Sequence, residues 1–314
     1  MARRAPGWPA GILLLDKPQG WTSHDVVAKA RGICHQRRIG HTGTLDPMAT
    51  GLLVLCLGHA TRLVEYMSEH DKQYVGEIVL GVSTDTDDAE GQVIAKQPVP
   101  PLDDAVLRSL EQEFTGVIEQ VPPAYSAVKV EGQRAYAVAR RGGELDLAAR
   151  PVRIDRIRLA LLEPGRLSIH LGCGPGTYVR SIARDIGAAV GCGAHLAALR
   201  RTRVGQFDIG EAMTIEQLQA YVIENRLHEV LRTADEGLMD LDAAIVSAEH
   251  GRALRNGLGI AVAVPPARSA KAIRVYDTSG YFVATGRFDI SGKLRPAKVM
   301  PEISLMSSTD TNSD

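Results

Sequence analysis

The sequence lacks the features that mark membrane-spanning, disulfide-stabilised and zinc-binding proteins. Its longest apolar run, Leu52–Leu57, is far shorter than the roughly 20 residues that cross a bilayer. The four cysteines have no CxxC spacing and the nine histidines form no HExxH pair, so neither a zinc site nor a disulfide framework is indicated. No apolar stretch of signal-peptide length follows the N-terminal residues. We therefore expect a cytoplasmic protein with no membrane association, no metal and no cofactor.

Aromatic residues are scarce, at 4%, and the net charge is only −1, so the chain as a whole is neither strongly basic nor strongly acidic. The charge is spread unevenly along it. Residues 65–119 hold 13 acids and 3 bases, whereas residues 126–158 hold 8 bases and 4 acids. Such a chain can present a basic surface to a polyanion, and solvated faces are the alternative interpretation.

The apolar patterns predict a mixture of strands and helices without a regular βαβ rhythm. This mixture indicates an α+β fold, with a mostly antiparallel sheet flanked by helices. We expect helices that start at Thr22 or Ser23, over 60–68, from Asp103 or Asp104 to about 114, up to 190, and over 214–225. We expect strands over 11–15, 52–57, 74–82, 117–121, 127–131, 152–162 and 167–172.

A loop around 235–242 separates a last segment with its own strand pattern. There, 273–276 and 281–285 flank Asp277–Gly280, which is typical of a hairpin turn. The chain is therefore expected to comprise an N-terminal extension (1–10), a main domain (11–239), a small β-rich domain (240–303) and a polar, disordered tail (304–314).

Two short motifs suggest a ligand but have simpler interpretations. Gly172–Thr177 departs from the dinucleotide pattern G-x-G-x-x-G at its last position, and a turn with Thr177 as a helix N-cap is favoured. Asp85, Asp87 and Asp88 lack the glycine and glutamate of a calcium loop, so a solvated acidic turn is favoured.

The segment Gly40–Gly51 carries a single carboxylate, Asp46, between Leu45 and Pro47. Pro47 has a fixed φ and keeps Asp46 out of the helical region. A carboxylate on a stiffened loop is one way in which a site places a charge, and a turn aspartate bound to its own backbone is the alternative.

Stretches in chain order over about residues 11–300 resemble the motifs of the TruB-type tRNA pseudouridine synthases of bacteria, which act on uridine at tRNA position 55. The stretches are Leu14–Ser23, Gly40–Gly51, Asp71–Tyr74, Pro123–Lys129, Gly176–Ser181 and Cys192–Arg201. The resemblance implies the pseudouridine synthase fold and a C-terminal RNA-binding domain of the PUA type. It also implies a monomer that acts on the T-arm of tRNA and needs no protein partner.

The same resemblance implies roles for individual residues. Asp46 is the catalytic carboxylate, Arg180 is the cation that keeps it ionised, and Tyr74 stacks on the base and lies near its C5 proton. Lys17 supports the site, His41 fills or supports the space that the flipped base leaves, and Leu199 walls the uracil pocket. Tyr178, in the arginine motif, is expected to contact the substrate.

A basic segment over about 121–149 resembles the thumb that closes on the RNA. Its cations Lys129, Arg134, Arg140 and Arg141 are expected to meet phosphates. Two alternatives remain open. One is a tRNA-binding or tRNA-folding module whose catalysis is incidental, and the other is the related guide-RNA-dependent synthase, for which this chain is short.

Overall fold

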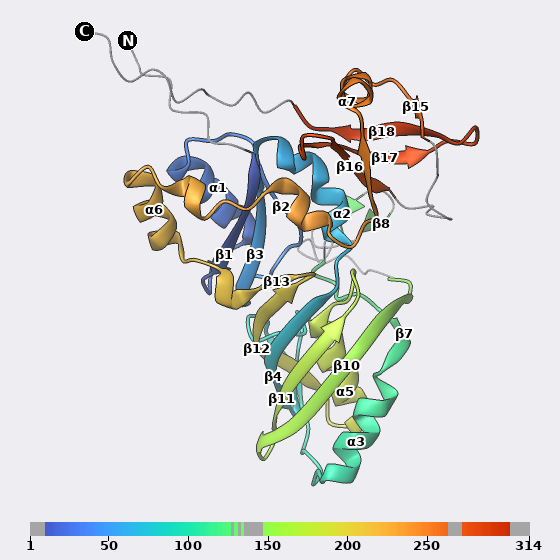
Figure 1. The fold of residues 1–314 in the computed structure, drawn as a ribbon. Helices are drawn as coiled ribbons and strands as arrows, with labels where there is room; N and C mark the ends of the chain where they lie inside the picture. Colours follow the sequence, from blue (N-terminus) through green and yellow to red (C-terminus); the bar gives the residue numbers. More distant parts are fainter. Residues whose placement is uncertain (1–9, 127–128, 131–132, 135–146, 263–271, 302–314) are drawn as a thin grey trace.

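The computed structural model describes residues 10–126, 129–130, 133–134, 147–262 and 272–301 (Figure 1). Within them, one nine-stranded sheet forms the main body. Its spatial order is β1 (Gly11–Lys17), β3 (Thr50–Leu57), β12 (Ala194–Val204), β4 (Lys72–Leu80), β11 (Arg166–Cys173), β10 (Arg150–Glu163) and β7 (Gly116–Gln120), with β2 (Ile39–His41) on β3 and β13 (Phe207–Asp208) on β12. Neighbouring strands are antiparallel except β12 and β3, which are parallel. The predicted α+β class with a mostly antiparallel sheet is confirmed.

Helices cover this sheet, and local capping fixes where several of them begin. They are α1 (Ser23–Ile33), the 3₁₀ turn η1 (Gly58–Leu63), α2 (Val64–Ser68), α3 (Asp104–Glu113), α5 (Val179–Val190) and α6 (Ile215–Ile223). Thr22 and Asp25 form a capping box at the start of α1, Asp103 caps α3, and Thr214 caps α6. Further 3₁₀ turns are η2 (Ile209–Glu211), η3 (Leu227–Glu229) and η4 (Ala234–Leu238).

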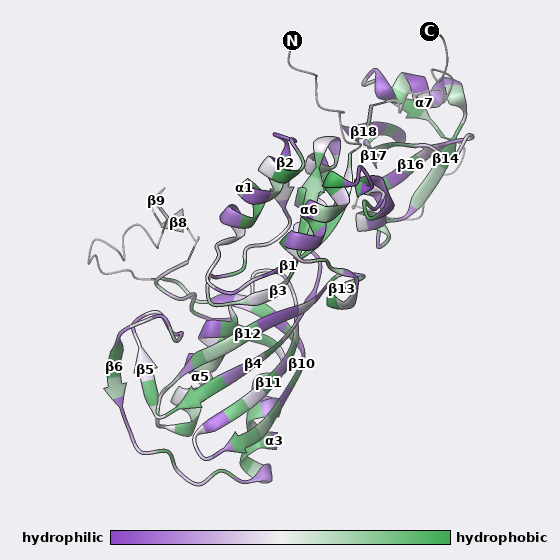
Figure 2. Cartoon of the chain, turned by 90° about the vertical axis from the view of Figure 1, so that its left-hand side faces the viewer, coloured by the Kyte–Doolittle hydropathy of each residue, from purple (hydrophilic) through white to green (hydrophobic). Residues whose placement is uncertain are grey.

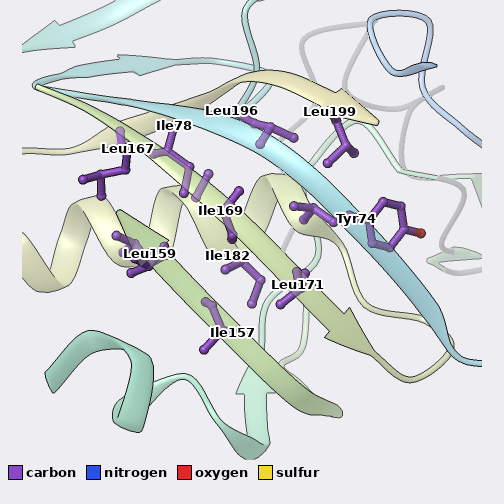
Figure 3. Packing of buried hydrophobic residues seen from close by; sticks show 14 of the residues in the cluster. Tyr74, Ile78, Ile157, Leu159, Leu167, Ile169, Leu171, Ile182, Leu196 and Leu199 are labelled. Atoms are coloured by element: carbon purple, nitrogen blue, oxygen red, sulfur yellow. The ribbon is translucent and has the colours of Figure 1, made fainter. Parts of the chain in front are cut away.

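Apolar residues of the sheet and helices divide the core into clusters. In one of them α5 and α3 pack on β4, β11 and β10, and Figure 3 shows Ile78, Ile169, Leu171 and Ile182 at its centre. Tyr74 and Leu199 lie at one end of this cluster (Figure 3). Two more clusters lie on the opposite faces of β1 and β3, one of them under α1 and α6. The end of β4 that carries Tyr74 is therefore anchored in this packed cluster.

A second sheet forms the C-terminal part, at the opposite end of the molecule from α3 (Figures 1 and 2). Its order is β14 (Ala243–Val246), β16 (Ile273–Asp277), β17 (Phe282–Phe288), β18 (Lys293–Val299) and β15 (Ile260–Ala261), and α7 (Ala248–Arg255) packs on it. It touches the main body through the hydroxyls of Tyr66 and Thr285, 3.0 Å apart, and through Arg62, whose guanidinium donates to the carbonyl of Val299. Small hairpins pair β5 (Val82–Thr84) with β6 (Val93–Lys96), and β8 (Lys129–Val130) with β9 (Gln133–Arg134).

The structure corrects several local predictions. The strand expected over 74–82 ends at Leu80, because Gly81 has a φ of +80° that breaks the extended backbone. Thr177 is not the N-cap of α5: that position belongs to Tyr178, and the Thr177 hydroxyl instead donates to the carbonyl of Gly174. The predictions did not include β12 or α7. The strand predicted over 127–131 lies partly outside the described residues.

Candidate active site

A cavity of about 430 Å³ opens where β4, β12, the start of α5 and the loop between β2 and β3 meet. The register of the sheet brings these elements together. Leu199 of β12 lies opposite Gly76 of β4, and Arg201 lies opposite Tyr74. A Cβ on Gly76 would stand 2.6 Å from the carbonyl oxygen of Ala198, so the close approach of the two strands requires glycine there. The lining residues are His41–Asp46, Ser68, Lys72, Tyr74, Tyr125, Ser126, Gly176–Arg180, Leu199 and Arg201.

The loop that carries Asp46 is fixed by buried hydrogen bonds. The Ser23 hydroxyl, at the start of α1, both accepts from the Leu45 amide (2.8 Å) and donates to the Leu45 carbonyl (3.1 Å). The amide of Ala49 donates to the Asp46 carbonyl at 3.1 Å, and Gly20 donates to Pro47 at 2.8 Å. These contacts hold the backbone on both sides of the carboxylate, so the side chain of Asp46 is presented to the cavity from a rigid loop.

Arg180, in the first turn of α5, contacts the Asp46 carboxylate with two of its nitrogens. Its Nε lies 2.9 Å from Oδ2 and its Nη2 lies 3.3 Å from Oδ1. Arg180 also donates to the carbonyls of Thr86 and Tyr125, each at 3.0 Å. Only 4% of the residue is exposed. Of these two contacts to the Asp46 carboxylate, the one from Nη2 has hydrogen-bond geometry and the one from Nε is an ion-pair contact. A planar guanidinium can approach both carboxylate oxygens in this forked way, whereas an ammonium cannot.

A second carboxylate shares the same guanidinium. Asp88 Oδ2 lies 3.5 Å from Arg180 Nη1, and Asp88 is buried. Its neighbour Asp87 pairs with Arg184, one turn along α5, at 3.0 Å. The prediction of a solvated acidic turn over 85–88 is therefore wrong at two of its three acids. They turn inward because α5 presents arginines to them, and partners so far apart in the sequence leave no local pattern.

The charges around Asp46 act on its pKa in opposite directions. Burial raises the pKa of Asp46, the positive charge of Arg180 lowers it, and the negative charge of Asp88 raises it. Arg180 is thus the main group that favours the ionised form of this half-buried carboxylate, and the charge of Lys17 acts more weakly in the same direction.

Tyr74 and Leu199 form an apolar wall of the cavity. Tyr74 is buried, and its hydroxyl points away from the apolar cluster (Figure 3). Burial raises the pKa of Tyr74, and the nearby positive charge of Arg201 opposes that shift. The phenol is therefore neutral near pH 7. The two side chains come from adjacent strands and belong to one apolar cluster, and a flat ring beside a branched aliphatic side chain is a suitable surface for a planar base to pack against.

Arg201 is a site residue that the sequence reasoning missed. It is 1% exposed. Its Nε donates to the carbonyl of Leu52 at 2.8 Å, while Nη2 and Nη1 donate to the carbonyls of Gly43 and Thr44 at 3.1 and 3.4 Å. Because Leu199 and Arg201 are two residues apart on one strand, they share a face. The shared face was not available as a signal because β12 was not predicted, and the sequence offered only the position of Arg201 at the end of the stretch Cys192–Arg201.

Two buried lysines are likewise held by backbone carbonyls. Lys17 Nζ donates to Pro18, Trp21 and Pro47 at 2.5–3.2 Å. Burial lowers the pKa of Lys17 to about 8, and the charge of Asp46 opposes the shift. Lys17 supports the Asp46 loop from behind and does not line the cavity. Lys72, which does line it, donates to the carbonyls of Ser68 and His70.

The remaining predicted residues are placed as follows. His41 lines the cavity and meets the ring of His24 edge-on at 5.6 Å. Burial, followed by the nearby charges of His24 and Arg201, lowers the pKa of His41 to about 4, so it is neutral at pH 7. Tyr178 also lines the cavity, with the guanidinium of Arg150 5.1 Å from its ring centre. Of the thumb cations, Arg140 and Arg141 lie outside the described residues, and Lys129 and Arg134 are described only as parts of β8 and β9.

Within the described ranges, no group of three or more His, Cys, Asp or Glu side chains is gathered as metal ligands are. All four cysteines are buried and unpaired. In the same part of the chain, no helix combines the length and apolar character needed to cross a bilayer.

Comparison with known proteins gives consistent matches. The model of the TruB family pseudouridylate synthase N-terminal domain matches residues 31–179, and that of the tRNA pseudouridylate synthase B C-terminal domain matches 180–249. The chain is 42% identical to tRNA pseudouridine synthase B of Aromatoleum aromaticum, over 93% of each chain. It is 43% identical to the protein of the same name from Ruegeria pomeroyi, over 95% of this chain and 98% of the relative.

Solved structures share the fold. A chain in the crystal structure of a Cbf5–Nop10–Gar1 complex superposes with a TM-score of 0.73 at 26% identity, covering 93% of this chain and 85% of that one. A chain in an H/ACA RNP bound to a substrate RNA containing 2′-deoxyuridine gives 0.72 at 24% identity, with the same coverage.

Proposed function

The chain belongs to the TruB family of pseudouridylate synthases, and from this premise we propose that it isomerises uridine 55, in the T-loop of tRNA, to pseudouridine. Family membership supports the reaction and the class of substrate. The observation that carries the assignment to this site is Asp46. It is a carboxylate paired with a buried arginine, on a rigid loop, facing a cavity walled by a tyrosine and a leucine.

The reaction needs few chemical groups. The N1–C1′ bond of the nucleotide breaks, the uracil turns, and a C5–C1′ bond forms; the C5 proton leaves and N1 takes up a proton. There is no net redox change. Ionised Asp46 lies beside the ribose, where it either attacks C1′ or removes a proton from the sugar. Arg180 keeps that carboxylate ionised after the nucleotide enters and water leaves.

The base must leave the RNA to reach Asp46. Enzymes that act on a base within folded nucleic acid commonly flip the nucleotide into a pocket. The cavity, of about 430 Å³, lies in the size range of small-molecule sites. We propose that the uracil stacks on Tyr74, with the phenol near C5, and that Leu199 forms part of the apolar wall of its pocket. His41 fills or supports the space that the flipped base leaves, Tyr178 contacts the substrate, and Lys17 acts through the loop.

The wider organisation belongs to the same proposal. Residues 11–239 form the catalytic domain, and 240–303 form a PUA-like domain that binds RNA. The thumb, with Lys129, Arg140 and Arg141, meets phosphates. We expect the enzyme to act as a cytoplasmic monomer without a protein partner, metal or cofactor, and sedimentation of the enzyme with and without tRNA measures its oligomeric state.

Mapping the product tests the proposal. An unmodified tRNA transcript is incubated with the enzyme, treated with a carbodiimide that marks pseudouridine, and read by primer extension. We expect one new stop, from pseudouridine at position 55, and none in a matched transcript with cytidine there. Absence of any stop, or a stop that persists in the cytidine transcript, would overturn the assignment.

A further inference from the structure

A shallow, open hollow lies on the surface formed by the end of α1, β2 and η1. Its volume is about 560 Å³, and it shares no lining residue with the active-site cavity. Four exposed arginines, here called the arginine face, lie in or beside it: Arg31, Arg37, Arg38 and Arg62. The remaining lining is provided by Ile39, Gly40, Thr61 and Val64.

None of these four guanidinium groups forms an ion pair with an aspartate or glutamate in the described part of the chain. The acid nearest in sequence to Arg62, Glu65, pairs instead with Lys298 at 3.2 Å. Many other arginines of the described molecule pair with a carboxylate, but these four do not. Because clustered like charges repel one another, an anion bound at this surface would relieve that repulsion.

Two of the arginines are also held in place. Arg31 Nη2 donates to the carbonyl of Ile39 at 2.7 Å, and Arg62 donates to the carbonyl of Val299. The pKa of His59 is lowered mainly by burial and further by the nearby positive charges of Arg62 and Arg38. His59 is therefore uncharged at pH 7 and does not add to the repulsion. Arginines anchored in this way are ordered before any ligand arrives.

The arginine face is joined to the active site by the short strand β2. Arg38 directly precedes β2, and His41 at the other end of that strand lines the cavity. Three residues of extended chain span about 10 Å. In the opposite direction, Arg62 reaches β18 of the C-terminal sheet. The elements that carry the face thus lie between the cavity and the C-terminal part: β2 ends at His41 in the cavity lining, and Arg62 of η1 contacts β18.

We infer that the arginine face binds backbone phosphates of the same tRNA arm whose flipped uridine enters the cavity. This inference rests on the proposed function. A guanidinium fork matches phosphate oxygens, and duplex RNA is recognised mainly through phosphates, 2′-hydroxyls and shape. A protein partner fits less well, because the cores of protein interfaces are depleted of charge.

The test measures tRNA binding across a salt series for the double variant Arg37→Ala/Arg38→Ala. No hydrogen bond or ion pair of either side chain to the described protein is present, so truncation leaves no group unsatisfied. Each lost phosphate contact lowers the slope of log Kd against log salt by about 0.7 to 0.9. We expect the slope to fall by about 1.4 to 1.8, and Arg37→Lys/Arg38→Lys to restore it.

Arg108→Ala is the matched control, because Arg108 is exposed on α3 at the far end of the molecule. It should leave the slope unchanged. An unchanged slope in the double alanine variant, or an equal fall in the control, would overturn the inference. Primer extension with the wild-type enzyme distinguishes a failure of the arginine-face inference from a failure of the proposed function. If wild type makes pseudouridine 55 while the double variant keeps its slope, only the arginine face is refuted. If wild type makes none, the proposed function fails.

Discussion

The two sides of the active-site cavity hold their buried charges differently. On the α5 side, Arg180 lies between two carboxylates, those of Asp46 and Asp88. On the side formed by β12 and β4, the cations of Arg201 and Lys72 donate to backbone carbonyls, and no carboxylate of the described residues forms an ion pair with either. The cation on the α5 side therefore pairs with carboxylates, whereas the cations on the other side are held by backbone carbonyls.

This difference separates chemistry from positioning. A buried ion pair is weak support for stability, because desolvation offsets most of the attraction. The Arg180–Asp46 pair is therefore best understood through its effect on the ionisation of Asp46. The carbonyl contacts of Arg201 tie the loop 43–44 to β12, so removing them should affect loop position and folding. Substitutions on the α5 side should consequently lower the reaction rate, whereas substitutions on the other side should also lower the free energy of unfolding.

The largest expected effect is that of Asp46→Asn. The amide has nearly the same shape but cannot act as a carboxylate, so turnover should fall by about 10³-fold or more. Affinity for tRNA should change little, since it is spread over many phosphate contacts. Single-turnover rates and Kd measured on the same preparation check both. Turnover within tenfold of wild type would contradict the role of Asp46.

Arg180→Lys should come next, with a loss of about 10²-fold. The charge is retained, but an ammonium cannot make the forked contact, so Asp46 is held less well. Arg184→Lys is the matched control. It lies one turn along α5, pairs with Asp87 rather than Asp46, and should stay within about threefold of wild type. Equal losses in the two variants would show that Arg180 has no special part in catalysis.

On the other side of the cavity, Arg201→Met should act on stability as well as rate. It leaves three carbonyls without a donor, and we expect the free energy of unfolding to fall by about 2 to 4 kcal/mol. Arg203→Met, at an exposed position of β12 that lies beyond a register irregularity after Arg201, should have almost no effect. Chemical denaturation of both variants gives the comparison. A stable Arg201→Met protein would mean that the carbonyl contacts do not hold the loop.

The smallest expected effect is a shift of the acid limb of the pH–rate profile. Asp88 raises the pKa of Asp46, so Asp88→Asn should lower it. The rate requires ionised Asp46 and falls as pH drops through its pKa, so the acid limb of the pH–rate profile should move to lower pH. Asp85→Asn, in the same turn but exposed, should leave the limb in place. Movement of the limb to higher pH for Asp88→Asn would contradict this electrostatic account.

The sequence was sufficient for the parts that local patterns encode. The apolar pattern predicted a strand beginning at Tyr74, which lies within β4, and a helix over 214–225, where α6 lies. Thr22 and Asp103, the caps of α1 and α3, were each one of two residues at which a helix was expected to start. The loop with Pro47 drew attention to Asp46. Arg180 was singled out as its partner through the family resemblance, and the structure brings the two side chains together.

The parts that the sequence did not reveal depend on contacts between distant segments. Asp88 lies in an acidic run typical of a solvated face, and only the packing of α5 shows that it is buried. Arg201 follows another arginine in a basic strand, and its three carbonyl partners come from the loop before β3 and from β3 itself. Thr177 was a reasonable N-cap by residue type, but its hydroxyl donates to the carbonyl of Gly174 instead.

The central claim is that this cavity isomerises one uridine of tRNA, and counting released protons tests it most directly. A transcript carrying tritium at C5 of every uridine is incubated to completion with wild-type enzyme. Isomerisation at one position predicts about one equivalent of tritium in water per tRNA, and none from a transcript with cytidine at position 55. Release of no tritium, or equal release from the two transcripts, would contradict the account.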